Sequence, residues 1–223
     1  MPISPIAAYP LPRRADWPAD AVRWRPEPSR AALLVHDMQE YFLAPYAAQA
    51  EPRRSVTANA AALLDAARRT GMPVYYTAQP GSMTSAERGL LMDVWGPGMR
   101  ADEADRSIVA PLAPAPGETV LTKWRYSAFA RTDLADRLAA AGRDQLIVCG
   151  VYAHVGCLMT ACDAFTRDIQ PFLVADALAD FSRDYHVQAL TYAAERCAAT
   201  PATAEVLDAL LPVPVPALAS AAH

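Results

Sequence analysis

The chain has 223 residues, of which 53% are hydrophobic and 20% charged, which is enough apolar material for one large domain with a buried core. Its formal net charge is −4, and its 20 basic and 24 acidic residues are mixed along the chain rather than gathered in a stripe or a tail. This pattern argues against a nucleic-acid-binding surface, and no apolar stretch is long enough to span a membrane.

The first 30 residues are rich in proline, and we expect them to form an irregular arm anchored by Trp17 and Trp24. The beginning of the chain lacks the long apolar run of a signal peptide. Four cysteines follow in the second half of the chain: Cys149, Cys157, Cys162 and Cys197. They form no CxxC pair, and no histidine pair has metal-ligand spacing, so we expect buried, reduced thiols in a cytoplasmic protein without metal or cofactor.

From residue 31 onward, strand-like patterns alternate with helical ones. The run "AALLVH" at 31–36 is short, apolar and continuous, as in a strand buried on both faces. Further strands are expected at 73–79, 119–123, 145–150 and 171–178, with a weakly indicated sixth at 197–200. Helices are expected at 55–71, around 131–141, from about 156, around 184–196 and at 203–211.

This alternation predicts one doubly wound α/β domain over 31–211, with a mostly parallel six-stranded sheet, helices on both faces and a disordered tail at 212–223. In such folds ligands bind beyond the carboxyl ends of the strands. Asp37, Lys123 and the loop 152–156 follow strands, so we expect them to face one pocket. Taken singly, each has a simpler interpretation, with Asp37 as a helix N-cap and Lys123 as an exposed strand-end charge.

Three segments carry a longer pattern: "LLVHDMQEYFL" at 33–43, "LTKWRYSAF" at 121–129 and "CGVYAHVGCLMTACDAFTRDIQPFLVADALADFS" at 149–182. They resemble the isochorismatase family, and the similarity extends over about residues 9–210. The resemblance implies a doubly wound parallel sheet, in agreement with the predicted elements. Thiol hydrolases of the same superfamily use an Asp, a Lys and a nucleophilic Cys. Asp37 and Lys123 match the first two, whereas Gly156 stands at the Cys position, as in the isochorismatases.

The neighbouring Cys157 is expected to be structural rather than catalytic. One step along a helix turns a side chain by about 100°, so this thiol should point away from the pocket. Gly156 is expected to leave room where a thiol would stand. An amidohydrolase that rotates Cys157 into the pocket is the alternative. His36 and His154 match no catalytic position of the family and are expected to be core or supporting residues.

The resemblance implies hydrolysis of an enolpyruvyl vinyl ether without a covalent intermediate. An acid protonates the terminal CH2, water adds to the resulting oxocarbenium ion, and the hemiketal collapses to pyruvate and a ring alcohol. Asp37 is the expected acid, and Lys123 is expected to bind a carboxylate of the dianionic, chorismate-derived substrate. The other substrate contacts implied by the resemblance are Phe42, Gln79, Arg88, Trp95, Tyr126, Tyr152 and Gly156. Taken alone, Arg88 would be a surface charge and the aromatic residues ordinary core.

The segment 78–100 is most similar to the phenazine-pathway branch of the family. This implies hydrolysis of 2-amino-2-deoxyisochorismate to trans-2,3-dihydro-3-hydroxyanthranilate and pyruvate. The segments 155–165 and 179–184 are as similar to the siderophore branch, so isochorismate, which yields 2,3-dihydroxy-2,3-dihydrobenzoate, is the alternative. A cysteine amidohydrolase or an inactive interaction module is less favoured. We also expect a homodimer whose pockets form within each subunit.

Overall fold

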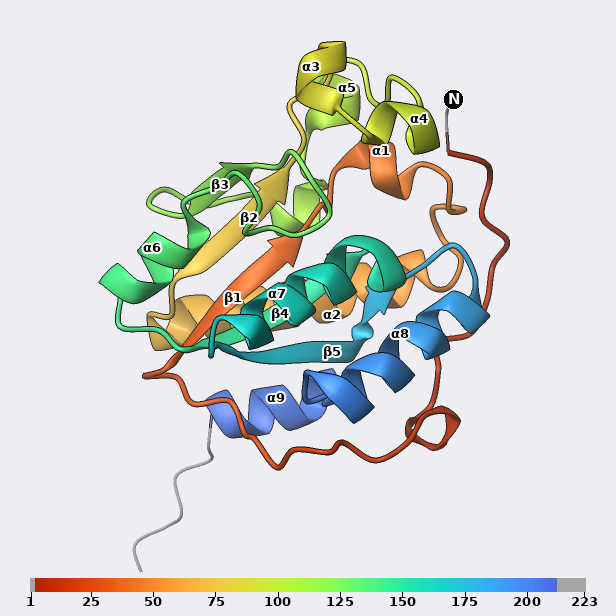
Figure 1. The fold of residues 1–223 in the computed structure, drawn as a ribbon. Coiled ribbons are helices and arrows are strands. Elements are labelled where there is room, and N and C mark those ends of the chain that lie inside the picture. The colour runs from red at the N-terminus through yellow and green to blue at the C-terminus, as the bar shows by residue number, and fades with distance from the viewer. Residues whose placement is uncertain (1–2, 212–223) are drawn as a thin grey trace, which may run out of the picture.

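A parallel sheet of five strands runs through the centre of the fold in the order β3-β2-β1-β4-β5 (Figure 1). The computed structural model describes residues 3–211. The strands are β1 (Ala31–His36), β2 (Val74–Ala78), β3 (Thr119–Thr122), β4 (Gln145–Val151) and β5 (Gln170–Ala179). In the ladder, His36 aligns with Thr77 of β2 and with Gly150 of β4, so the carboxyl ends of these three strands lie at the same level. The doubly wound α/β class is confirmed.

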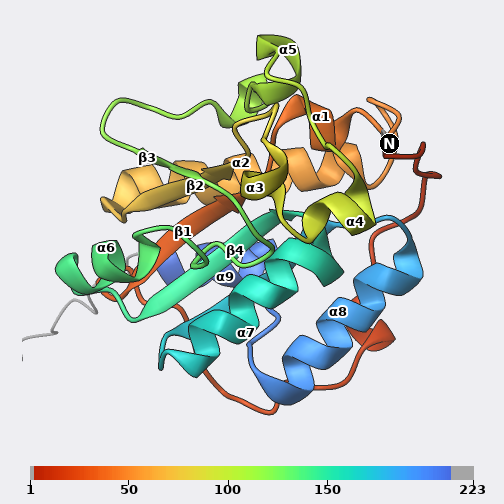
Figure 2. The ribbon, with the colours of Figure 1, turned by 45° about the horizontal axis from the view of Figure 1, so that its top comes forward.

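The longer helices cover both faces of this sheet, as Figures 1 and 2 show. One face carries α2 (Arg53–Thr70) and α9 (Thr203–Leu210), and the other carries α6 (Leu134–Ala140), α7 (Leu158–Thr166) and α8 (Arg183–Arg196). No helix in the described part of the chain is long and apolar enough to cross a membrane.

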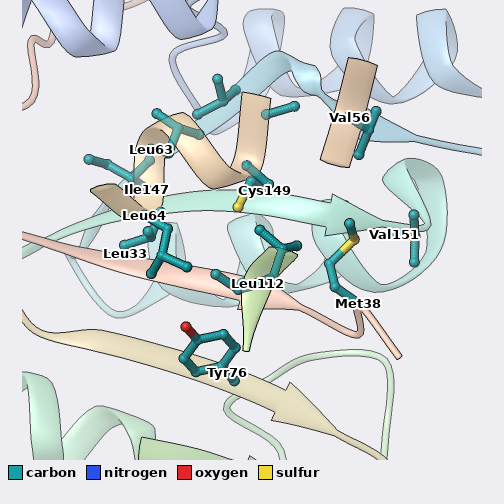
Figure 3. Close-up of a cluster of buried hydrophobic side chains, with 14 of the residues drawn as sticks. Leu33, Met38, Val56, Leu63, Leu64, Tyr76, Leu112, Ile147, Cys149 and Val151 are labelled. Carbon is teal, nitrogen blue, oxygen red and sulfur yellow. The ribbon is translucent and has the colours of Figure 1, made fainter. Parts of the chain in front are cut away.

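Alternate residues of β1 pack into two separate hydrophobic cores. Leu33 and Val35 belong to the core under α2, whereas Ala32 and Leu34 belong to the core under α6, α7 and α8. Figure 3 shows the first core, where side chains from α2 meet those of the central strands. Because β1 is buried on both faces, its sequence is continuously apolar, as the run at 31–36 predicts.

The weakly indicated sixth strand is wrong as a strand. The segment 197–200 makes a single parallel bridge, between Ala199 and Phe172 of β5, and the described sheet has five strands. The Ala199 N–H donates to the Pro171 carbonyl, and the Leu173 N–H donates to the Ala199 carbonyl. Pro201 follows and has no N–H to donate, so the ladder ends after one bridge.

Four short helices lie above the carboxyl edge of the sheet: α1 (Glu40–Leu43), α3 (Ser85–Arg88), α4 (Leu91–Trp95) and α5 (Glu103–Arg106). A helix directly after Asp37 was considered as the simpler interpretation of that residue, and no bounds were predicted for the other three. The start of α3 carries a capping box, in which the Thr84 hydroxyl accepts from the Glu87 N–H at 3.3 Å and the Glu87 carboxylate accepts from the Thr84 N–H at 2.8 Å. This Thr-x-x-Glu pattern is readable in the sequence and would have located the helix.

The arm at 3–30 runs along the outside of its own domain (Figure 1). Trp17 is buried in the core under α6, α7 and α8, and its indole N–H donates to Thr200 at 2.9 Å. Trp24 lies beside Phe165, with ring centroids 6.4 Å apart. The arm contains one turn of 3-10 helix, η1 (Arg14–Asp16). The predicted tail at 212–223 lies outside the described residues.

Candidate active site

A cavity of about 520 Å³ opens at the carboxyl edge of the sheet. It is lined by the ends of β1, β3, β4 and β5, the short helices α1, α3 and α4, and the beginning of the arm. The structure brings together at this cavity all nine residues that were singled out from the sequence: Asp37, Phe42, Gln79, Arg88, Trp95, Lys123, Tyr126, Tyr152 and Gly156.

Asp37 and Lys123 form a buried ion pair on the cavity wall. The Lys123 ammonium donates to Asp37 Oδ2 at 2.9 Å, and the two residues are only 3% and 5% exposed. Asp37 directly follows β1 with φ of 51°, in the left-handed region that Asp tolerates better than most residues. It caps no helix, since α1 begins only at Glu40. The simpler interpretations of both residues are therefore wrong.

Thr77 holds Asp37 in place from the neighbouring strand β2. Its hydroxyl accepts from the Asp37 backbone N–H at 3.0 Å and donates to Asp37 Oδ1 at 2.5 Å. Each carboxylate oxygen of Asp37 therefore has one donor, Thr77 for Oδ1 and Lys123 for Oδ2. Sequence reasoning missed Thr77, although its register beside the end of β1 follows once the strands are aligned.

The space beside Gly156 is filled by the imidazole of His36. A Cβ atom built on Gly156 would lie 2.3 Å from His36 Cε1. His36 is fully buried, its Nδ1 donates to the Val151 carbonyl at 2.9 Å, and Nε2 has no hydrogen-bond partner among the described residues. Burial lowers the pKa of His36 to about 4, so the ring is neutral near pH 7. The expectation that Gly156 leaves vacant space is wrong, because this imidazole occupies it.

The thiol of Cys157 points away from the cavity, as expected. It is fully buried in the core under α6, α7 and α8, and burial raises its pKa well above the usual range. Cys157 ends the π-helical turn η3 (Ala153–Cys157), which connects β4 to α7. Cys149 and Cys197 are buried too, but Cys162 is partly exposed, so the prediction of four buried thiols is wrong for Cys162.

Arg88 is a buried cation without an acidic partner among the described residues. It is 5% exposed, its Nε donates to the Gly96 carbonyl at 2.8 Å, and Nη1 donates to Gln79 Oε1 at 3.2 Å. Burial lowers the pKa of this guanidinium. Gly98 lies so close that a Cβ there would be 2.6 Å from Arg88 Nη2. The interpretation of Arg88 as a surface charge is therefore wrong, and its position suits an anion.

Aromatic side chains form another part of the cavity wall. The rings of Trp95 and Phe181 stack with centroids 5.8 Å apart, and those of Phe181 and Tyr152 stack at 4.1 Å. The Trp95 indole donates to the Tyr126 hydroxyl at 2.7 Å, and the Tyr152 hydroxyl donates to the Phe42 carbonyl at 2.7 Å. Tyr152, expected as a polar contact, thus contributes its ring to a stack and uses its hydroxyl to fix α1.

Twelve other residues line the cavity: Ile3, Ser4, Pro5, Ile6, Tyr41, Leu91, Val94, Arg125, Val151, Val155, Phe181 and Tyr185. Val155 lies in the loop 152–156 that was expected at the pocket, and the other eleven were missed. Arg125 lies two residues after Lys123, inside the segment 121–129, so its position near the cavity could have been predicted from the sequence. The arm residues 3–6 reach the cavity only through tertiary packing, with the Ile6 N–H donating to the Pro45 carbonyl at 2.9 Å. No local sequence pattern predicts such a contact.

His154 supports the turn beside the cavity rather than lining it. Its backbone N–H donates to Asp180 Oδ2 at 2.6 Å, and its Nδ1 lies 2.7 Å from Oδ1 of the same fully buried carboxylate. Its ring stacks on Tyr185 at 4.4 Å. Within residues 3–211, no three His, Cys, Asp or Glu side chains gather as a metal site would require.

Comparison with known proteins agrees with this geometry. The family model described as the isochorismatase domain matches residues 31–206. The phenazine biosynthesis protein PhzD1 of Pseudomonas aeruginosa is 58% identical over 206 residues, covering 92% of this chain and 99% of the relative. Enterobactin synthase component B of Escherichia coli is 50% identical over 217 residues, covering 97% of this chain and 75% of the relative.

Among solved structures, a cysteine hydrolase from Pseudomonas syringae pv. phaseolicola superimposes with a TM-score of 0.77 at 26% identity, covering 92% of this chain and 98% of that one. The fold and the cavity place the chain in the doubly wound α/β class, with its candidate site at the carboxyl edge of the sheet. The chain belongs to the isochorismatase family, as its sequence motifs predict. It is an enzyme of the isochorismatase type. Its cavity is lined by an Asp–Lys pair, and the described cavity residues include no thiol.

Proposed function

We propose that this enzyme hydrolyses the enolpyruvyl ether of 2-amino-2-deoxyisochorismate to trans-2,3-dihydro-3-hydroxyanthranilate and pyruvate. The observation that carries the proposal is the position of Asp37, the only acidic side chain among the described cavity residues, in a cavity that is also lined by Gly156, which stands where related hydrolases place a thiol. The greater identity to PhzD1, 58% against 50% for the enterobactin protein, favours the amino substrate over isochorismate.

The reaction needs a proton on carbon rather than a nucleophile. Asp37, in its acid form, donates a proton to the terminal CH2 of the enolpyruvyl group, and the ether carbon becomes an oxocarbenium ion. The Asp37 carboxylate left behind stabilises this cation at close range in a largely apolar cavity. Water then adds to the cation and returns a proton to the Asp37 carboxylate, and the hemiketal collapses to pyruvate and the ring alcohol. No bond to the protein forms at any step.

Three cations line the cavity and are available to the two carboxylates of the substrate: Arg88, Lys123 and Arg125. The Lys123 ammonium has three N–H bonds, and Asp37 is its one hydrogen-bond partner among the described residues, so donors remain for a carboxylate. A substrate carboxylate that accepts from Lys123 is thereby held next to Asp37.

Pyruvate release tests the proposal directly. The purified chain is given each of the two enolpyruvyl ethers, and pyruvate is measured with a coupled dehydrogenase, with Asp37→Asn as the background control. We expect a higher kcat/KM for the amino substrate. A higher value for isochorismate would assign the enzyme to the alternative substrate. Failure to release pyruvate from either compound would refute the proposed chemistry.

We further propose that the enzyme is a cytoplasmic homodimer with one complete cavity in each subunit. The hydrophobic fraction of 53% supports the burial of further apolar surface between two copies of the chain. Closed two-fold dimers are the commonest oligomers. The free thiols support a reducing compartment. Light scattering should give about twice the 24.0 kDa chain mass, and a monomer with full activity would contradict a functional requirement for the dimer.

A further inference from the structure

Two of the four cysteines face each other outside the active site. The sulfurs of Cys162 and Cys197 are 3.7 Å apart, although the residues are 35 positions apart in the chain. Cys162 lies on α7, and Cys197 directly follows α8, the helix packed beside α7 (Figure 2). Neither residue lines the cavity, and the proposed reaction uses no thiol.

We propose that Cys162 and Cys197 form an oxidisable dithiol site, which low-molecular-weight disulfides convert into an intrachain disulfide bond. The sulfurs are already in contact and must approach by only about 1.7 Å to reach the disulfide bond length of about 2.05 Å. Cys149 and Cys157 are fully buried, and Cys149 instead contacts the Leu34 carbonyl at 3.7 Å. The placement thus selects one pair out of four thiols.

The two thiols of the pair differ in the way that such a reaction requires. Cys162 is partly exposed to solvent, whereas Cys197 is 6% exposed. A hydrogen bond from the Cys197 S–H lowers the pKa of Cys162, and the same bond raises the pKa of Cys197. A thiolate that is accessible and stabilised attacks first, and a neighbouring buried thiol resolves the intermediate.

The reaction has two exchange steps. The Cys162 thiolate attacks one sulfur of oxidised glutathione, the reagent's S–S bond breaks, and one glutathione thiolate leaves. Cys197 then loses its proton to that thiolate and attacks the Cys162 sulfur, and the second glutathione leaves as a thiolate that takes a proton from solvent. Two protein thiols are oxidised by two electrons, and one glutathione disulfide is reduced to two thiols.

The new bond would tie the middle of α7 to the end of α8. Closing this loop restricts the unfolded chain, so oxidation should raise the Tm, by up to roughly 10 °C on loop entropy alone. Because both cysteines lie outside the cavity, kcat and KM for pyruvate release should change by less than about twofold.

The test is a thiol count on the full chain after incubation with oxidised glutathione. In denaturant, we expect the four free thiols to fall to two, with a non-reduced peptide map that joins Cys162 to Cys197 and a higher Tm. Cys162→Ser and Cys197→Ser should each abolish the cross-link, whereas the matched Cys149→Ala should keep it. Four surviving thiols, a lasting glutathione adduct on Cys162, or a lower Tm after oxidation would overturn the proposal. None of these readouts depends on which substrate the enzyme uses.

Discussion

The two sides of the cavity are built differently. The sheet wall is formed by Asp37, Thr77 and Lys123, which lie at or next to strand ends, and by Gly156 in the turn η3. Its polar side chains are at most 5% exposed and bonded to one another. The lid, residues 79–98 with the short helices α3 and α4, has Leu90 at 82% and Val94 at 65% exposure. Side chains of the lid contact the rest of the cavity, as in the hydrogen bond that Trp95 donates to Tyr126.

We infer from this contrast that the sheet wall carries the catalytic acid and that the lid binds the substrate. In the sheet wall, the acid is fixed by a ladder of parallel strands, which keeps catalytic groups within the narrow limits that proton transfer needs. In the lid, Arg88 grips Gln79 and the Gly96 carbonyl, and the Arg125 guanidinium donates to the Glu87 carbonyl at 2.7 Å. Changes in the wall should therefore lower kcat, whereas changes in the lid should chiefly raise KM.

The largest effect is expected from the acid itself. Asp37→Asn should lower kcat by about 10²–10⁴-fold with little change in KM, because an amide cannot deliver the proton. Thr77→Ser, which keeps the hydroxyl that contacts Asp37, serves as the matched control and should retain most activity. Pyruvate release near the wild-type rate from Asp37→Asn would show that the wall does not hold the acid.

In the lid, Arg88→Ala should lower kcat/KM by about 10–100-fold, mainly through KM, because a charge-assisted hydrogen bond to the substrate is worth about 1.5–3 kcal/mol. The side chain of Arg100, 81% exposed just beyond the lid, offers the control, and Arg100→Ala should leave both constants unchanged. A fall in kcat without a rise in KM would mean that Arg88 acts on the transition state alone, which would remove the distinction between the two sides.

The packing of the sheet wall can be probed at Gly156. Gly156→Ala places a methyl group against the locked His36 ring, and such overpacking costs about 1–3 kcal/mol of unfolding free energy. Denaturant unfolding should show this loss, and His36→Ala should recover part of it when combined with Gly156→Ala, since the two sites share one space. If the two losses of unfolding free energy were fully additive, the His36 ring could not lie against Gly156.

The smallest effect is expected at the neighbouring thiol. Cys157→Ala should keep kcat within about twofold of the wild type and lower stability by roughly 1 kcal/mol through a small core cavity. Iodoacetamide should likewise fail to inactivate the native enzyme through this residue, because it is fully buried. A collapse of turnover at unchanged stability would restore the thiol mechanism.

The sequence predicts the sheet wall better than the lid for a physical reason. The strand β1 is buried and continuously apolar, so its end, and with it Asp37, is readable from the pattern alone. Lys123 follows the short edge strand β3, which is mostly exposed and carries a weaker pattern. The strand β5 covers the expected 171–178 with one more residue at each end, and within it the Asp176 carboxylate accepts from the Thr203 N–H at 2.7 Å. Phe181, two residues beyond the end of β5, was missed as a cavity residue.

The lid could not be predicted from periodicity. Its helices are four and five residues long, too short to show a repeating apolar face. Arg88, Trp95 and Gln79 were predicted as substrate contacts only through the family resemblance. Gly98 packs closely against the guanidinium of the buried Arg88, and the apolar pattern gives no sign of this contact. The contact between the His36 ring and Gly156 likewise joins segments that are far apart in the sequence.

Hydrolysis in ¹⁸O-labelled water tests the central claim most directly, because it shows which carbon the water attacks. Protonation of the enolpyruvyl CH2 by Asp37 directs water to the ether carbon of that group, so the heavy oxygen should enter pyruvate and the ring product should keep its ordinary mass. Mass spectrometry of the ring product is decisive, since its hydroxyl does not exchange with water as the pyruvate carbonyl does. Heavy oxygen in the ring hydroxyl would show attack at the ring carbon and would contradict acid catalysis on the vinyl ether.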